Sequence, residues 1–279
     1  MRNFKGKVAV VTGAGSGIGR ALALALARNG AELALSDIDE ASLEETRAQA
    51  APTSPRVTTR RIDVSDRGAI EAWATDVAAE HGRVNLVFNN AGVALSSAIV
   101  DMSHEDLEWL MGINFWGVVY GTKSFLPHLL ESGDGHVINI SSVFGMIAVP
   151  GQSAYNAAKF AVRGYTECLR EELDIMEAGV SATCVHPGGI KTNIARSARM
   201  SGTTLGDFPP DASIQRFDEL ARTTPANAAE TILKGVQKDA RRVLIGFDAR
   251  IIDTVQRLLP TTYQRILVNR SKAERAKLL

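Results

Sequence analysis

Short apolar runs alternate along the chain with longer segments in which apolar residues recur every three or four positions. The short runs are rich in valine and isoleucine, which is typical of strands that are buried on both faces of a sheet. The longer segments have the composition and the period of helices. Strands that alternate with helices predict right-handed βαβ units and a parallel sheet covered by helices on both faces.

Seven strands are predicted, at residues 7–12, 33–36, 57–63, 84–88, 136–141, 180–185 and 242–245. Helices are predicted at 21–29, 40–50, 66–81, 104–130 with interruptions near Gly112 and Gly117, 153–177 and 225–239. No linker divides this series, so we expect one α/β domain of the Rossmann type, doubly wound, over residues 1–250. Residues 251–279 are expected to extend that domain. The irregular stretch 188–224 predicts a lid or a substrate-binding loop.

Composition narrows the class of protein only a little. The 279 residues include 31 Lys or Arg and 31 Asp or Glu, so no net charge favours nucleic acid as a partner. Cys168 and Cys184 have no metal or disulfide spacing, and we expect buried thiols in a reducing compartment. No signal peptide or membrane-spanning run is evident, and the cytoplasm is the expected location.

A glycine-rich turn follows the first predicted strand and reads Thr-Gly-Ala-Gly-Ser-Gly-Ile-Gly over residues 12–19. Glycines allow the backbone to approach a pyrophosphate closely, and the N-terminus of the next helix favours negative charge. The spacing fits T-G-x-x-x-G-x-G and lacks the G-K-[ST] ending of a P-loop. We therefore expect dinucleotide contacts from Gly13, Ser16, Gly17, Ile18 and Gly19.

Asp37 ends the second predicted strand, eighteen residues after Gly19. An acid at about this distance is expected to bind the adenosine ribose hydroxyls, and it would repel a 2′-phosphate. No Lys or Arg lies at positions 36–39, so the sequence favours NAD, with NADP less favoured. The alternative is that Asp37 only caps the next helix.

Polar or small residues also follow the third and fourth predicted strands. They are Asp63 and Val64 in one place, and Asn90, Ala91 and Gly92 in the other. Ligands of open α/β sheets bind at the carboxyl ends of strands, so these residues are candidate cofactor contacts. Ordinary turn formation is the alternative, because Asp, Asn and Gly all suit turns.

Tyr155 and Lys159 lie four residues apart in one predicted helix, so their side chains share a face. A nearby ammonium favours the phenolate, which would bring Tyr155 into range for proton transfer near neutral pH. Ser142 ends the preceding strand and could hold a substrate oxygen. Such a Tyr–Lys pair alone is more often a local surface contact. A serine nucleophile would need a histidine base, but His136 lies six residues before Ser142 on the same strand and should point elsewhere, and His186 has no evident partner.

Taken in order, these motifs resemble those of the short-chain dehydrogenase/reductase family over about residues 5–250. The matching residues are Thr12–Gly19, Asn89–Gly92, Asn114, Ser142, Tyr155, Lys159 and Pro187–Thr192. The resemblance implies hydride transfer between nicotinamide and a hydroxyl or carbonyl carbon. It implies that Tyr155 is the general acid/base, that Lys159 binds the nicotinamide ribose and lowers the tyrosine pKa, and that Ser142 holds the substrate oxygen. It further implies that Asn114 holds a water, and that the nicotinamide is contacted by Pro187, Gly188, Ile190 and Thr192.

The expected activity is NAD(H)-dependent oxidoreduction of a lipophilic secondary alcohol or ketone. Apolar residues near the motifs suggest the lipophilic pocket, and they are Val93, Leu95, Phe144, Met146, Ile147 and Val149. An NADP(H)-dependent carbonyl or 3-oxoacyl reductase is one alternative, and a non-catalytic dinucleotide-binding regulator is another. No metal is expected, since the five histidines show no ligand spacing.

The C-terminal segment is basic, with nine Lys or Arg against three Asp or Glu over residues 241–279. One helix face in it is apolar and comprises Ile251, Ile252, Val255, Leu258 and Leu259, and Pro260 then interrupts the helix. Packing on the same domain or across a homo-oligomer, a tetramer or a dimer, is one interpretation. Attachment to an anionic membrane surface is the other.

Overall fold

Seven parallel strands form the central sheet of the computed structural model, which describes residues 3–202, 219 and 221–275. The strands are β1 (Val8–Thr12), β2 (Glu32–Asp37), β3 (Val57–Arg61), β4 (Leu86–Asn89), β6 (Gly135–Ile140), β7 (Val180–Pro187) and β9 (Arg242–Ile245). Their order in the sheet is β3-β2-β1-β4-β6-β7-β9. The predicted seven-stranded sheet of the Rossmann type is confirmed.

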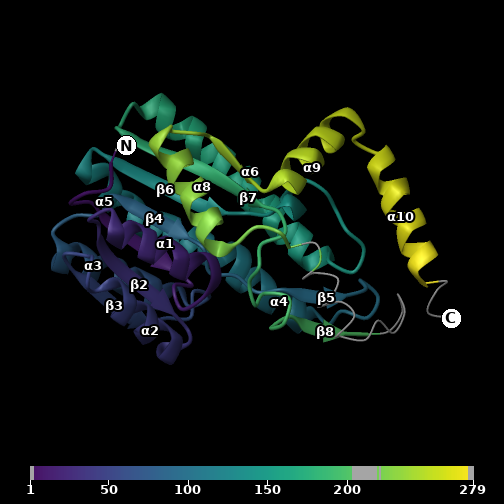
Figure 1. Ribbon diagram of the computed structural model, residues 1–279, viewed down its shortest axis with the longest axis horizontal. Helices are drawn as coiled ribbons and strands as arrows, with labels where there is room; N and C mark the ends of the chain where they lie inside the picture. Colours follow the sequence, from purple (N-terminus) through teal and green to yellow (C-terminus); the bar gives the residue numbers. More distant parts are fainter. Residues whose placement is uncertain (1–2, 203–218, 220, 276–279) are drawn as a thin grey trace.

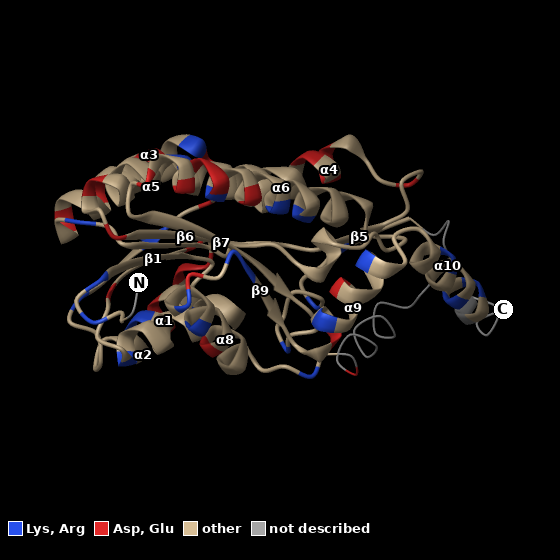
Figure 2. Ribbon diagram, turned by 90° about the horizontal axis from the view of Figure 1, so that it is seen from above, with Lys and Arg blue, Asp and Glu red and all other residues tan. Residues whose placement is uncertain are grey.

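Helices cover both faces of this sheet, as Figure 2 shows. One layer contains α3 (Arg67–His81), α5 (Gly117–Ser132) and α6 (Ser153–Met176), and the other contains α1 (Gly17–Arg28), α2 (Glu40–Ala50) and α8 (Pro225–Gln237). Two further helices, α9 (Phe247–Leu258) and α10 (Thr262–Arg275), lie at the end of the molecule remote from the N-terminus (Figure 1). Every residue of β1 is buried, because helices pack on both of its faces.

Some predicted boundaries are wrong, and the glycine turn explains the largest error. Helix α1 begins at Gly17, not at residue 21, because the Arg20 N–H already donates a helical hydrogen bond of 3.0 Å to the Ser16 carbonyl. Strand β3 ends at Arg61 and not at 63, and β4 covers Leu86–Asn89 and not 84–88. The predicted interruption of the helix at 104–130 is confirmed, since a π-helix (Gly112–Trp116) separates α4 (His104–Met111) from α5.

A second, two-stranded sheet was not predicted. It pairs β5 (Leu95–Ser97) with β8 (Arg199–Ser201), and β8 belongs to the stretch 188–224 that we expected to be a loop. The Arg199 guanidinium lies 3.6 Å from the centroid of the Trp109 ring and 3.2 Å from Asp106, which holds β8 against α4. Strands of three residues carry no readable period. Residues 203–218 and 220 of the predicted loop lie outside the described residues.

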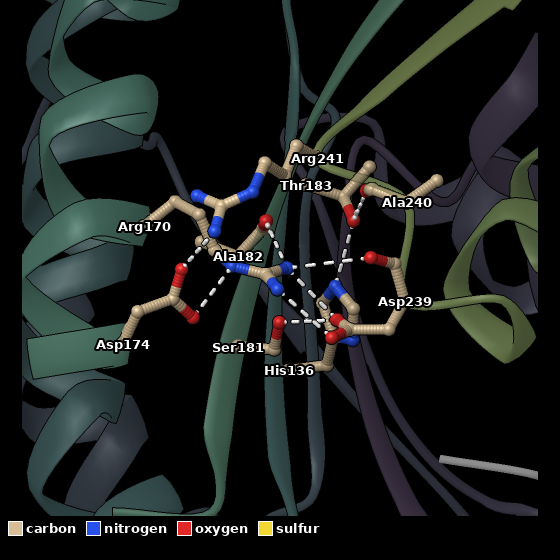
Figure 3. A network of polar contacts seen from close by, with 9 residues as sticks. All are labelled: His136, Arg170, Asp174, Ser181, Ala182, Thr183, Asp239, Ala240 and Arg241. Atoms are coloured by element: carbon tan, nitrogen blue, oxygen red, sulfur yellow. Dashed lines mark hydrogen bonds and ion pairs between the residues drawn. The ribbon is translucent and has the colours of Figure 1, made fainter. Parts of the chain in front are cut away.

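A polar network ties α6 to β7 and to the turn before β9 at the amino-terminal edge of the sheet (Figure 3). Arg170 forms two hydrogen bonds of 2.8 Å with the carboxylate of Asp239 and one of 2.9 Å with Asp174. Buried His136 contacts the hydroxyl of Thr183 at 2.7 Å. This network is remote from the carboxyl edge, so its role in the fold is structural.

The two cysteines differ in exposure. Cys184 is buried in β7, but Cys168 is exposed on α6, so the prediction of two buried thiols is wrong for Cys168. Within the described residues, no helix is long and apolar enough to cross a membrane.

Candidate active site

The chain changes direction between β1 and β4, because β2 and β3 lie on one side of that pair and β6, β7 and β9 on the other. A crevice for ligands is expected at the carboxyl ends of two such strands. The turns after both strands meet there. The Thr12 hydroxyl accepts hydrogen bonds from the backbone N–H groups of Asn90 (3.0 Å) and Ala91 (3.1 Å), and the Asn90 amide donates to the Thr12 carbonyl (2.9 Å).

The glycine turn is packed so closely that side chains at Gly13 and Gly19 would collide with their neighbours. A Cβ at Gly13 would lie 2.8 Å from Ala91 Cα, and one at Gly19 would lie 2.0 Å from the Gly13 carbonyl oxygen. Gly17 has a φ of +52°, which favours glycine. Ser16 precedes α1 without capping it through its side chain, so the first N–H groups of this helix are left for another acceptor. These residues therefore fit the pyrophosphate of a dinucleotide.

Asp37 lies directly against the glycine turn. Its Oδ2 accepts a hydrogen bond of 2.8 Å from the Gly15 N–H, and its Oδ1 accepts one of 3.0 Å from the Asp39 N–H. Helix α2 is capped by Asp39, which accepts from the Ser42 N–H, and not by Asp37. The alternative that Asp37 caps this helix is therefore wrong.

The residues after β3 are arranged differently. The Asp63 carboxylate accepts hydrogen bonds from the Ser65 N–H (2.9 Å) and hydroxyl (2.7 Å), which is the turn chemistry considered as the alternative. Val64 is buried against Gly117, where a Cβ would lie 2.8 Å from Val64 Cγ2. The Asp63 side chain is exposed, so its hydrogen bonds with Ser65 do not prevent the predicted contact with the cofactor.

Tyr155, Lys159 and Ser142 come together where β6 ends and α6 begins. The Ser142 side chain lies near enough to the Tyr155 hydroxyl to lower its pKa, and Ser142 Oγ accepts a hydrogen bond of 3.1 Å from the Phe144 N–H. Lys159 Nζ lies 5.6 Å from the centroid of the Tyr155 ring and donates a hydrogen bond of 2.9 Å to the Ile140 carbonyl. The neighbouring Ser141 instead donates to the Lys159 carbonyl (2.8 Å), which agrees with the choice of Ser142.

Asn114 approaches this group from the π-helix. Its amide exchanges two hydrogen bonds of 2.8 Å with the backbone of Val93, which fixes its orientation. A Cβ at Gly92 would lie 3.3 Å from Asn114 Oδ1 and 3.6 Å from Lys159 Nζ. Asn114 and Lys159 therefore meet at the turn after β4, and Tyr155 lies beside Lys159.

Burial controls the ionisation of the pair. It raises the pKa of Tyr155 to about 12, against the smaller opposing effect of the Ser142 side chain. It also lowers the pKa of Lys159 to about 8. The direction is opposite to the expected shift towards neutrality, because loss of hydration has the largest effect on the pKa of Tyr155.

The segment after β7 returns to the glycine turn. A Cβ at Gly17 would lie 3.1 Å from Thr192 Cγ2, so Thr192 packs beside the expected pyrophosphate position. Ile190 is buried and forms a bridge with Thr223. A hollow of about 280 Å³ on this side is lined by Lys191, Thr192, Asn193 and Arg196. Of the predicted contacts from Pro187 to Thr192, Thr192 thus lies beside the glycine turn.

Comparisons with known proteins agree with this geometry. The family model described as "short chain dehydrogenase" matches residues 7–201. The chain is 49% identical to "Putative oxidoreductase SadH" of Mycobacterium tuberculosis, over 96% of each chain. It is 29% identical to estradiol 17-beta-dehydrogenase 11 of Pongo abelii, over 95% of this chain and 83% of that one. A short-chain dehydrogenase/reductase from Burkholderia phymatum, solved in complex with NAD, is 32% identical and has a TM-score of 0.81, with 88% of this chain and 90% of that chain covered.

The chain belongs to the short-chain dehydrogenase/reductase family. It is therefore an oxidoreductase with a nicotinamide dinucleotide as cofactor. Within the part of the chain that the structure describes, no group of three or more His, Cys, Asp or Glu could hold a metal ion.

Asp248, in the first turn of α9, is a site residue that the sequence did not reveal. Its Oδ2 accepts a hydrogen bond of 2.7 Å from the Gly189 N–H, and a Cβ at Gly188 would lie 2.2 Å from the same oxygen. Asp248 therefore fixes the segment expected to contact nicotinamide. The sequence could have indicated it. Asp248 follows the carboxyl end of the last strand, as Asp63 follows that of the third, and ligands of open α/β sheets bind at these ends.

His186 is a second residue whose place was misjudged. Its Nδ1 lies 2.9 Å from the Ser142 carbonyl oxygen, so the expectation that it has no partner is wrong. Burial lowers its pKa to about 4, so the ring is neutral and Nδ1–H donates to that carbonyl. This histidine contacts the backbone of Ser142 and not its hydroxyl, which gives no support to a serine nucleophile in this member of the short-chain dehydrogenase/reductase family.

Proposed function

We propose that the protein is an NAD(H)-dependent oxidoreductase acting on a lipophilic secondary alcohol or ketone, with Tyr155 as general acid/base. The observation that carries the proposal is the placement of Lys159 Nζ 5.6 Å from the centroid of the Tyr155 ring, with the Ser142 side chain near enough to lower the pKa of the tyrosine. The hydroxyls of Tyr155 and Ser142 and the ammonium of Lys159 lie at the carboxyl edge of the sheet. Such groups suit proton transfer to or from the oxygen of a substrate whose carbon exchanges a hydride with the cofactor.

Each residue has a defined part in this reaction. When bound, the nicotinamide accepts or supplies the hydride. During ketone reduction, the Ser142 hydroxyl donates a hydrogen bond to the carbonyl oxygen, and Tyr155 transfers its phenolic proton to that oxygen. The phenolate that remains is stabilised by the Lys159 ammonium. During alcohol oxidation, the Tyr155 phenolate takes the hydroxyl proton instead.

NAD is favoured over NADP by the position of Asp37. Its carboxylate accepts a hydrogen bond from the Gly15 N–H, beside the turn that fits the pyrophosphate. The hydroxyls of the adenosine ribose are the expected partners of an acid in this position. A 2′-phosphate would meet this negative charge at short range. The glycine turn, Asn90–Gly92 and Pro187–Thr192 would hold the rest of the cofactor, with Lys159 on the nicotinamide ribose.

A lipophilic substrate is supported by the surroundings of Tyr155. Phe144 packs edge-on against the tyrosine ring, with 6.1 Å between the centroids, and it is half-buried, as are Val93 and Val149. The other apolar residues assigned to the pocket are buried in the core, and they are Leu95, Met146 and Ile147. The relative named estradiol 17-beta-dehydrogenase 11 bears the name of a steroid alcohol, which supports this substrate class.

Absorbance of reduced nicotinamide, measured with a panel of steroid and long-chain secondary alcohols and ketones, tests the proposal. We expect Tyr155→Phe to lower kcat at least about a hundredfold, because general acid/base catalysis contributes that much or more. NADH binding, followed by fluorescence, should persist. Tyr165→Phe, further along the same helix, is the matched control and should keep its activity. If wild type binds NADH but turns over no substrate, the non-catalytic regulator is the better description.

A further inference from the structure

Helices α9 and α10 concentrate exposed apolar side chains. Fourteen large hydrophobic residues are exposed among the described residues, and six of them lie between 247 and 268, namely Phe247, Ile251, Leu258, Leu259, Ile266 and Val268. So many exposed apolar side chains in a short segment are unusual for a surface that faces only water. The surface formed by these six residues is called the C-terminal surface below.

One side of α9 carries an apolar row. Phe247, Ile251 and Leu258 are 78%, 46% and 73% exposed, and their spacing of four and seven residues places them on the same side of the helix. The opposite side holds Ala249, which is fully buried in a cluster with Val143 and Met146. The helix therefore has a fixed orientation, and its outer row has no partner within the described residues.

The charge of the segment indicates what covers this row. Residues 247–275, which span α9 and α10, carry six Lys or Arg and three Asp or Glu. Figure 2 shows Lys and Arg along both α9 and α10, with Asp or Glu also on α9. A second copy that met this surface across a two-fold axis would bring two basic segments together. An anionic lipid surface instead complements both the cations and the apolar row.

The C-terminal surface also borders the active site. Helix α9 packs on residues that follow Ser142, and its Asp248 holds Gly189 of the segment expected to contact nicotinamide. Helix α10 is held through Tyr263, whose hydroxyl accepts a hydrogen bond of 3.2 Å from the Ala148 N–H. We propose that α9 and α10 dock the protein on an anionic lipid surface, with the active site beside the bilayer.

Vesicle flotation of the full chain tests this contact without use of the enzyme activity. Vesicles of phosphatidylcholine alone are compared with vesicles that also contain phosphatidylglycerol. We expect the partition coefficient of wild type to be at least about ten times higher on the anionic vesicles and to fall as salt is raised. The double variant L258E/I266E should lose this preference. Ile175→Glu is the matched control, because Ile175 is 82% exposed on α6, and it should float as wild type does.

Three results would overturn the proposal. One is equal flotation of wild type on both kinds of vesicle, and another is equal loss of flotation in the Ile175 control. The third is that wild type does not bind vesicles and L258E/I266E has a lower mass than wild type in analytical ultracentrifugation. That result would show that a second copy of the chain covers the C-terminal surface. Both replaced side chains are exposed, and NADH binding by each variant verifies that it is folded. The proposed oxidoreductase activity can fail or succeed independently of these outcomes.

Discussion

Two opposing influences act on the hydroxyl of Tyr155. The motif places a lysine one helical turn away, and that spacing could be predicted from the sequence. The extent of burial could not, because it depends on Phe144 and on Ser142 at the end of β6, which come from other parts of the chain. The raised pKa keeps Tyr155 protonated at neutral pH, so the acid needed for ketone reduction is the resting form.

The two directions of the reaction should therefore respond differently to pH. Below pH 8, kcat/KM for alcohol oxidation should rise about tenfold per pH unit, because it requires the scarce phenolate. Ketone reduction should change little over the same range. Above pH 8 the rise should weaken, since Lys159, with a pKa of about 8, loses its charge. Initial rates in both directions measure this, and an oxidation rate that falls between pH 6 and 8 would contradict it.

Asp37 offers a prediction about the cofactor. Asp37→Ser should raise KM for NAD at least about tenfold and should reduce the preference for NAD over NADP by a similar factor, because the ribose partner and the repulsive charge are both lost. Asp39→Asn is the control, since it removes a neighbouring exposed charge but retains a capping side chain. An unchanged ratio of the two KM values in Asp37→Ser would show that the carboxylate does not select the cofactor.

At the scale of elements, the periodicity of apolar residues predicted the seven strands and the helices that cover them. Apolar runs and helical repeats alternate several times along the chain, so the pattern is clear. It did not predict β5 and β8, which have three residues each and depend on contacts such as that of Arg199 in β8 with Trp109. It also did not connect α9 with the segment after β7. That connection depends on Asp248 and Gly188, sixty residues apart in sequence.

The contact between Gly188 and Asp248 can be tested by a double-mutant cycle. Gly188→Ala should raise the Kd for NADH about tenfold, because its Cβ would lie 2.2 Å from the Asp248 carboxylate. Asp248→Ala should have an effect of similar size, since the loss of a hydrogen bond to a charged group costs about 2 kcal/mol. The double variant should be no weaker than either single variant, because the collision is absent.

Gly164→Ala serves as the control for this cycle, since no other atom lies within 4 Å of a Cβ placed there. Fluorescence titration with NADH gives the four dissociation constants. Effects that simply multiply, to about a hundredfold in the double variant, would show that the two residues act separately.

Two buried imidazoles affect the stability of the whole molecule. Burial lowers the pKa of His136 and of His186 to about 4, below the value of about 6.5 for an exposed histidine. The unfolded chain therefore binds more protons, so the free energy of unfolding is highest above pH 6.5 and falls as the pH decreases towards 4. Each imidazole should contribute about 3 kcal/mol to this fall.

Urea unfolding at several pH values measures the effect. His136→Gln should remove about half of the decrease between pH 6.5 and 5, a range above the usual titration of carboxylates. His104→Gln, at an exposed position, should leave the slope as in wild type. A free energy of unfolding that is constant from pH 7 to 5 would show that neither imidazole stays neutral in the folded protein.

The hydrogen bond between Gly189 and Asp248 spans 59 residues, which has a consequence for the order of events during synthesis. The ribosome makes the glycine turn near the start of the chain, and it makes Asp248 only after the last strand. A nascent chain can thus form the half of the site that receives the pyrophosphate while the nicotinamide half still lacks its anchor. We therefore expect firm retention of the cofactor only after α9 has emerged and packed, so that a helix near the end of the chain times the assembly of the holoenzyme.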